Sequence, residues 1–174
     1  MEKSYLNGEQ IYLRAIEPED LKSFYQIEND PDFWEISNFT VPYSRFMLTQ
    51  YIRNSANDMF ADKQLRLMIV RHSDHLVLGT IDITDFVPLH SRGAVGIAIL
   101  KEYREKGYGK EALSLLCEYA FGFLQMRQLY AHIPSDNTPS LNLFTSCGYE
   151  TCGVMKDWLK SGDGYKEVVM MQKF

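Results

Sequence analysis

A glycine turn, Arg104-Glu105-Lys106-Gly107-Tyr108-Gly109, lies directly between an apolar run and a helical pattern. The run at residues 95–100 predicts a buried strand, and the leucines that follow Gly109 recur at helical spacing. A strand that enters a helix through glycines leaves backbone N–H groups unpaired at the positive end of the helix dipole, with no Cβ atoms in the way. The turn therefore predicts an α/β fold with a phosphate or pyrophosphate site.

Two common phosphate loops do not fit this turn. A Walker loop needs a glycine six residues before its lysine and a hydroxyl after it, but Arg104 and Glu111 stand at those places. A dinucleotide fingerprint fits Gly107-x-Gly109-x-x-Ala112 but requires an acidic residue about 20 positions later. Residues 119–135 contain none. A simple tight turn remains an alternative to a ligand site.

Motifs further along the chain favour a particular family. The sequence continues with an expected strand at Tyr130-Ala131-His132-Ile133, a helix start at Asn137-x-x-Ser140, and Cys147-Gly148-Tyr149 after a short helix. The turn, the Asn-x-x-Ser and the Cys-Gly-Tyr together resemble the GNAT acyl-CoA N-acetyltransferases. The resemblance extends from Ile11-Tyr12-Leu13-Arg14 to Tyr165 and is closest to the spermidine acetyltransferases and the ribosomal-protein N-terminal acetyltransferases.

Composition narrows the class of protein further. At 174 residues the chain suits a single domain, which the resemblance identifies as an acetyltransferase domain over residues 1–174. The net charge of −5 argues against a nucleic-acid face. Its start lacks the apolar core of a signal peptide, and no run reaches the about 20 apolar residues of a membrane span, so we expect a cytoplasmic protein that does not bind membranes. A homo-oligomer is compatible with these features.

The cysteines predict no special chemistry. Three of them occur, Cys117, Cys147 and Cys152, and they lack the spacing of metal ligands. Two of the three fall on apolar faces of expected helices. We therefore expect reduced structural cysteines and no metal site.

The remaining pattern predicts a mixed α/β sandwich. Proline and acids at residues 18–20 open one helix, and Ser44 caps a second. The resemblance implies the GNAT fold, a mixed, mostly antiparallel central sheet with splayed fourth and fifth strands, flanked by helices. We expect strands at residues 11–16, 65–70, 77–86, 94–100, 128–133, 151–157 and 164–172.

The resemblance also implies where acetyl-CoA binds. Pantetheine would enter between the fourth and fifth strands and pair with the edge of the fourth, while the glycine turn would hold the pyrophosphate. Asn137 matches a family position near the pantetheine arm, although it is also an expected N-cap. The implied cofactor-binding residues are Ile97, Ala98, Ile99, Arg104, Glu105, Lys106, Gly107, Tyr108, Gly109, Lys110, Asn137, Ser140 and Phe144.

The implied reaction is direct attack of an amine on the thioester. A primary amine with a pKa near 10.4 is protonated at pH 7, so releasing its proton costs roughly 4 to 5 kcal/mol and a base is needed. Asp82 aligns with an acidic residue of the spermidine acetyltransferases and is the favoured candidate. Asp85 on the opposite strand face and His132 are alternative bases. If Asp82 has no catalytic role, it is simply one polar residue on an exposed strand face.

The acid that would protonate the leaving thiolate departs from the family pattern. Phe144 stands where many relatives carry a tyrosine, and it cannot donate a proton. Ser140 is a substitute donor or a simple helix-start hydroxyl. Other phenols are Tyr130, Tyr149 and Tyr165.

The acceptor is less defined by the sequence. Residues 34–39 carry one acid beside aromatics, whereas polyamine enzymes of this kind use several glutamates. Two roles are open for the aromatic residues, an acceptor wall or packing in the core and between helices: Trp34, Phe39, Tyr43 and Trp158. The leading function is acetylation of a small amine, a polyamine or a peptide N-terminus. The alternative, favoured by Phe144, is an inactive CoA-binding sensor or partner module.

Overall fold

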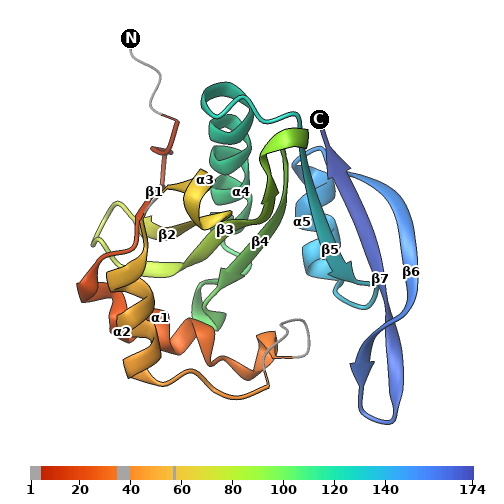
Figure 1. Cartoon of the computed structure of the whole chain (residues 1–174), viewed down its shortest axis with the longest axis horizontal. Coiled ribbons are helices and arrows are strands. Elements are labelled where there is room, and N and C mark those ends of the chain that lie inside the picture. The colour runs from red at the N-terminus through yellow and green to blue at the C-terminus, as the bar shows by residue number, and fades with distance from the viewer. Residues whose placement is uncertain (1–4, 35–39, 57) are drawn as a thin grey trace.

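The computed structural model describes residues 5–34, 40–56 and 58–174, which build a seven-stranded sheet in the order β1-β2-β3-β4-β5-β7-β6 (Figure 1). Neighbouring strands pair antiparallel, except for β4 and β5, which run parallel. The sequence therefore correctly predicted a mixed, mostly antiparallel sheet. The strands are β1 (Ile11–Ala15), β2 (Leu65–Arg71), β3 (Val77–Val87), β4 (Arg92–Ile99), β5 (Gln128–Pro134), β6 (Glu150–Ser161) and β7 (Gly164–Lys173).

Helices cover both faces of this sheet (Figure 1). Buried side chains of α1 and α2 pack on one face against Met68 and Val70 of β2. Those of α4 and α5 pack on the other face with Ile81 and Ile83 of β3, because successive strand residues point to opposite faces. The helices are α1 (Leu21–Glu28), α2 (Arg45–Asn54), α3 (Met59–Asp62), α4 (Tyr108–Glu118) and α5 (Thr138–Ser146).

The parallel pair β4 and β5 separates soon after it begins. Its paired positions are Arg92 with Gln128, Gly93 with Leu129 and Ala94 with Tyr130. Beyond Ala94, β4 continues to Ile99 while it stays paired with β3 on its other edge. We call the opening between the diverging halves the wedge. The splayed fourth and fifth strands that the family resemblance implied are confirmed.

Local signals explain most element boundaries. The Ser44 hydroxyl accepts a hydrogen bond from the Met47 N–H at 3.1 Å, so it caps α2 as predicted. The short α3, capped by Asp58, was not predicted, nor was the π-helical turn Tyr119–Phe123 that ends the long helix after the glycine turn. In the described part of the chain, no helix is long and apolar enough to span a membrane.

Candidate active site

The glycine turn enters α4 with its backbone donors open. Gly107 is the N-cap residue at φ 86°, a left-handed conformation that suits glycine, and no side chain caps the helix. The hydrogen bond from Glu111 N to Gly107 O, 3.1 Å long, marks the first turn, so the N–H groups before Glu111 lack α-helical partners. Nothing lies within 4 Å of where a Cβ on Gly107 would be. These features fit a bound phosphate group.

Three elements of the expected cofactor site meet at Gly109. A Cβ placed on Gly109 would lie 3.5 Å from a methyl carbon of Leu143 on α5 and 3.9 Å from one of Ile97 on β4. The turn is thus in contact range of the fourth strand and of the helix that follows the fifth. This is the arrangement that a pantetheine chain leading into the wedge from the turn would require.

Arg104 turns away from the helix start. Its Nε donates to the Ile99 carbonyl at 2.8 Å, and its Nη1 donates to Asp32 Oδ2 at 2.7 Å. Its Nη2 lies 3.5 Å from Asp30 Oδ2. Arg104 therefore ties the turn to the 3-10 turn η2 (Pro31–Phe33), and its charge is shared with two aspartates.

Other cations remain around the turn. Lys106 Nζ donates to the Glu102 carbonyl at 2.8 Å, and Lys110 is exposed. Glu105 adopts φ 61°, which bends the chain before the glycines. The expected roles of Glu105, Lys106, Tyr108 and Lys110 at a pyrophosphate remain predictions.

Asn137 and Ser140 form the start of α5. The Asn137 Oδ1 accepts a hydrogen bond from the Ser140 N–H at 3.2 Å, so the predicted N-cap is confirmed. Both side chains are half-buried. Their expected contacts with acetyl-CoA, and the proton-donor role of Ser140, are not tested by this geometry.

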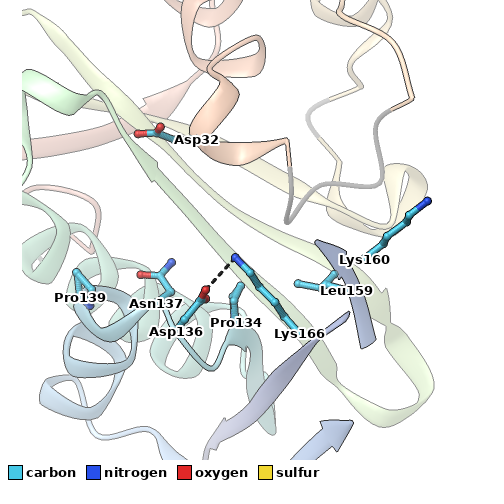
Figure 2. A pocket seen from close by; sticks show the side chains of 8 residues that line it. All are labelled: Asp32, Pro134, Asp136, Asn137, Pro139, Leu159, Lys160 and Lys166. Carbon is cyan, nitrogen blue, oxygen red and sulfur yellow. Dashed lines mark ion pairs between the residues drawn. The ribbon is translucent and has the colours of Figure 1, made fainter. Parts of the chain in front are cut away.

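A pocket of about 300 Å³ opens beside Asn137 (Figure 2). It joins the end of β5 and the start of α5 to the β6–β7 hairpin and to η2. Figure 2 shows Lys166 and Asp136 facing one another, and their charged atoms lie 2.8 Å apart. The lining residues are Asp32, Pro134, Asp136, Asn137, Pro139, Leu159, Lys160 and Lys166.

The carboxylates of this pocket are already paired. The hydrogen bond from Arg104 holds the pKa of Asp32 below its usual value, and that from Lys166 does the same for the pKa of Asp136. Both carboxylates are therefore ionised at neutral pH and face a cation. The lining residues include two aspartates and two lysines, so the described pocket is not strongly acidic.

A second charged group lies on the α1 side of the sheet, and we call it the carboxylate cluster. It consists of Glu28 on α1, Arg66 on β2 and Asp82 on β3. Arg66 donates to Asp82 Oδ2 from Nε at 3.2 Å and contacts it from Nη2 at 3.0 Å, while its Nη1 contacts Glu28 Oε1 at 3.0 Å. The side chains of Glu28, Arg66 and Asp82 are 9%, 19% and 14% exposed, respectively.

Burial and charge act in opposite directions in the carboxylate cluster. Burial raises the pKa of Asp82, although Arg66 and a hydrogen bond from the Gly96 backbone oppose this rise. Burial also raises the pKa of Glu28, opposed by Arg66 and reinforced by the negative charge of Asp82. For Arg66, burial disfavours the charge, but the two carboxylates hold its pKa above the ordinary value. One guanidinium thus serves two carboxylates.

Gly96 gives Asp82 its place beside the wedge. The two residues are paired across β3 and β4, and a Cβ on Gly96 would lie 2.5 Å from Asp82 Oδ1. Gly96 comes two residues after Ala94, where the pairing of β4 with β5 ends. The carboxylate therefore occupies the space left by the missing side chain, at the start of the wedge.

The other candidates lie in different surroundings. Asp85 and His132 are exposed, and His132 has its ring 5.4 Å from that of Tyr130. Phe144 is buried at 2% exposure and packs edge-on against Tyr149, with ring centroids 4.9 Å apart. Tyr149 is buried with its pKa raised by that burial, whereas Tyr165 is exposed.

The proposed aromatic wall is only partly described. Trp34 and Trp158 are exposed and Tyr43 is half-buried, while Phe39 and the single acid of that segment lie outside the described residues. The sequence did not reveal Glu28, Arg66 or Gly96 as members of a site. No motif links them, because they come from separate elements that only the folded sheet brings together.

The comparisons agree on one family. Residues 10–150 match the acetyltransferase (GNAT) domain family. The chain is 26% identical over 167 residues to the uncharacterised N-acetyltransferase p20 of Bacillus licheniformis, with 95% of this chain and 93% of that protein covered. It is 22% identical over 165 residues to the spermidine N(1)-acetyltransferase of Vibrio cholerae, with 93% and 91% covered.

A solved structure gives the same fold. The spermidine N-acetyltransferase of Vibrio cholerae in complex with CoA and spermine superposes with a TM-score of 0.82 at 21% identity. The match covers 94% of this chain and 95% of that one.

Proposed function

The chain belongs to the GNAT acetyltransferase family, and from this premise we propose that it acetylates a small-molecule primary amine with Asp82 as the base. Acetyl-CoA is the co-substrate, and an amine nitrogen receives the acetyl group. The observation that carries the proposal is the position of Asp82 opposite Gly96, at the start of the wedge.

The turn supplies the binding half of the site. Its open N–H groups at the start of α4 suit a pyrophosphate, and the exposed Lys110 adds positive charge. When bound, acetyl-CoA supplies an activated acetyl group as a thioester. The diverging edges of β4 and β5 provide backbone groups that suit the amides of a pantetheine chain.

Asp82 supplies the proton acceptor. Its Oδ2 is held by Arg66, and its Oδ1 is the oxygen that lies over Gly96. A carboxylate held charged by an arginine accepts a proton from an amine directly or through one water, which offsets part of the roughly 4 to 5 kcal/mol needed to expose the free amine at pH 7.

The pocket beside Asn137 favours a small acceptor. About 300 Å³ is at the lower end of the range for small-molecule sites. The spermidine and spermine in the names of similar proteins make polyamines the first acceptors to test. The paired aspartates of the pocket favour an amine with fewer positive charges than a polyamine.

The test is a screen for CoA release with purified protein and acetyl-CoA. Monoamines, polyamines, amino acids, aminoglycosides and N-terminal peptides are compared at equal concentration, with mass spectrometry of each product. Turnover of small amines above the peptides supports the proposal, whereas turnover of peptides alone would contradict it.

One observation favours a second function. Phe144 offers no proton for the leaving thiolate, as expected of a CoA-binding sensor that has lost catalysis. In that case calorimetry would show acetyl-CoA binding while every amine in the screen remained unmodified.

A further inference from the structure

We propose that Arg66 and Glu28 are positioning residues for Asp82: Arg66 fixes one oxygen of the carboxylate, and Glu28 competes for the same guanidinium and so sets the pH at which Asp82 takes up a proton. The inference rests on the proposed function, because it assumes that Asp82 is the base. It adds two residues, from α1 and β2, that neither the sequence motifs nor the family match assigned.

The geometry of Arg66 supports the first part. Two of its nitrogens contact the same oxygen of Asp82, Nε at 3.2 Å and Nη2 at 3.0 Å. Its plane is also held by aromatic rings, with Phe24 and Tyr51 centroids 5.5 and 5.6 Å from the guanidinium carbon. The carboxylates thus hold the edge of the guanidinium, and the aromatic rings hold its face. Because the guanidinium is fixed, the Asp82 carboxylate that it binds has little freedom to rotate, and Oδ1 stays over Gly96.

The position of Glu28 supports the second part. Its carboxylate takes the remaining arm of Arg66 at 3.0 Å and is 9% exposed. The charge of Asp82 raises the pKa of Glu28. Because the coupling between two carboxylates that share one cation is mutual, the charge of Glu28 also makes Asp82 harder to ionise. Removing the charge of Glu28 would leave the whole of Arg66 to Asp82 and lower the pH at which Asp82 becomes protonated.

The surroundings of the carboxylate cluster contain few other titratable groups. Tyr51 of α2 and Tyr43 before α2 have pKa values raised chiefly by burial, so both are neutral at the pH values concerned. Asp62 contributes to the raised pKa of Tyr51, whereas Asp82 is the carboxylate that raises the pKa of Glu28. From β4 only the Gly96 backbone contributes. Among the described residues, Arg66, Glu28 and Asp82 therefore dominate the titration.

The test is the pH profile of kcat at saturating amine and acetyl-CoA. In Glu28→Gln, whose amide oxygen can still accept from Arg66, we expect the acid limb to move down by about one pH unit. Activity at a pH on that limb should then rise by up to tenfold, with KM for acetyl-CoA unchanged. The matched control is Glu19→Gln, an exposed acid just before α1, which should leave the limb in place.

Arg66→Lys provides a second variant that keeps the charge. A lysine cannot contact both carboxylates in the same geometry, so we expect the acid limb to move up and kcat to fall. The double variant Arg66→Lys with Glu28→Gln should recover part of the loss, because the single ammonium is then left to Asp82. If the two residues had a purely structural role, Glu28→Gln would itself lower kcat, and the double variant would lose more activity than Arg66→Lys alone.

Failure of the inference is separable from failure of the proposed function. A fully active Asp82→Asn would remove the assumed base, whereas an inactive Asp82→Asn combined with an unmoved limb in Glu28→Gln would overturn this inference alone.

If no amine is turned over, unfolding by denaturant at several pH values tests the coupling in the carboxylate cluster. A Glu28 with raised pKa stabilises the fold below its unfolded pKa and loses this contribution as pH rises through its folded pKa. The stability of Glu28→Gln should therefore improve relative to wild type from pH 4 to pH 7, and a pH-independent difference would contradict the proposal.

Discussion

The glycine turn and the carboxylate cluster differ in what they offer a ligand. The turn is built from backbone, and its N–H groups at the start of α4 have no side-chain cap. The cluster is built from side chains that already bind one another, and among the described residues no buried side-chain polar atom lacks a partner. The turn is therefore open for an anion, whereas the cluster holds its groups in place before any substrate arrives.

This difference suits the two tasks that we propose for the regions, pyrophosphate binding by the turn and proton acceptance in the carboxylate cluster. A pyrophosphate needs several donors at once, and a helix start provides them wherever glycines allow close approach. A base must instead keep one oxygen available at the right pH, which requires partners that control both its rotation and its charge. Substitutions should therefore affect cofactor affinity in the first region and turnover in the second.

The largest effect should come from Asp82→Asn. Because an asparagine cannot accept the amine proton, we expect kcat to fall by a factor of roughly 100 or more at neutral pH. Affinity for acetyl-CoA, measured by calorimetry, should change little because the turn is untouched. Loss confined to the amine KM would instead assign Asp82 to substrate binding.

Asp85→Asn is the matched control for that change. Asp85 lies on the same strand three positions on, is exposed, and adopts φ 48°, a conformation that asparagine also tolerates. The kcat of Asp85→Asn should equal that of the wild type. An equal loss in both variants would show that the effect comes from the strand and not from the Asp82 carboxylate.

Gly107→Val should act on the other region. A β-branched side chain is strained at φ 86°, and its atoms would occupy the open space in front of the N–H groups. We expect acetyl-CoA affinity to fall at least tenfold, measured by calorimetry, in a protein whose folding is checked by circular dichroism. Gly162→Val, at φ 56° in the β6–β7 turn with nothing within 4 Å, introduces similar strain away from the turn and should bind normally.

Gly109→Val extends this test. Its new atoms would press on Leu143 and Ile97, the contacts that join the turn to α5 and β4. We expect an acetyl-CoA affinity at least tenfold weaker than that of the wild type. Unchanged affinity in both folded glycine variants would remove the turn from the cofactor site.

The same contrast explains what the sequence could predict. The turn and the Asn137 cap depend on local signals, namely glycines and an N-cap residue, and these were recognised in the sequence. The splayed strands were expected only from the resemblance to the GNAT family. The carboxylate cluster depends on which strands become neighbours. Arg66 and Asp82 are 16 residues apart and Glu28 is 38 residues before Arg66, so no spacing connects them.

Side-chain direction was also beyond the sequence. Arg104 belongs to the turn, and its charge was expected beside a phosphate. In the structure its guanidinium contacts Asp32 and the Ile99 carbonyl, and its role at a phosphate stays a prediction. A motif fixes the backbone at this point, but a long flexible side chain follows whichever acids the fold brings near.

Phe144→Tyr sharpens the comparison at the leaving group. The thiolate has a parent pKa near 8.5, so only about 2 kcal/mol is available from protonating it at pH 7, and we expect at most a tenfold rise in kcat. Because Phe144 is 2% exposed against Tyr149, a hydroxyl without a partner there would cost about 1 to 3 kcal/mol of stability, measurable by urea unfolding. A wild type inert to every amine with an active tyrosine variant would favour the CoA-binding module.

The smallest effect concerns Arg104, which joins the turn through Asp32 to the pocket beside Asn137, our proposed acceptor site. Both side chains are partly exposed, at 33% and 48%, so their contact contributes little to folding. We expect Arg104→Gln and Asp32→Asn each to change acetyl-CoA affinity and amine KM by about threefold. The double variant should cost no more than one single change, since both remove the same contact.

The Asp32 pKa lies below its usual value because of Arg104, so the pair contributes above the unfolded pKa near 3.9 and is lost only as pH falls below it. The coupling should therefore be equal at pH 6 and pH 8 but shrink in 1 M salt. If the effects of Arg104→Gln and Asp32→Asn were fully additive, the proposed cofactor and acceptor regions would act independently of one another.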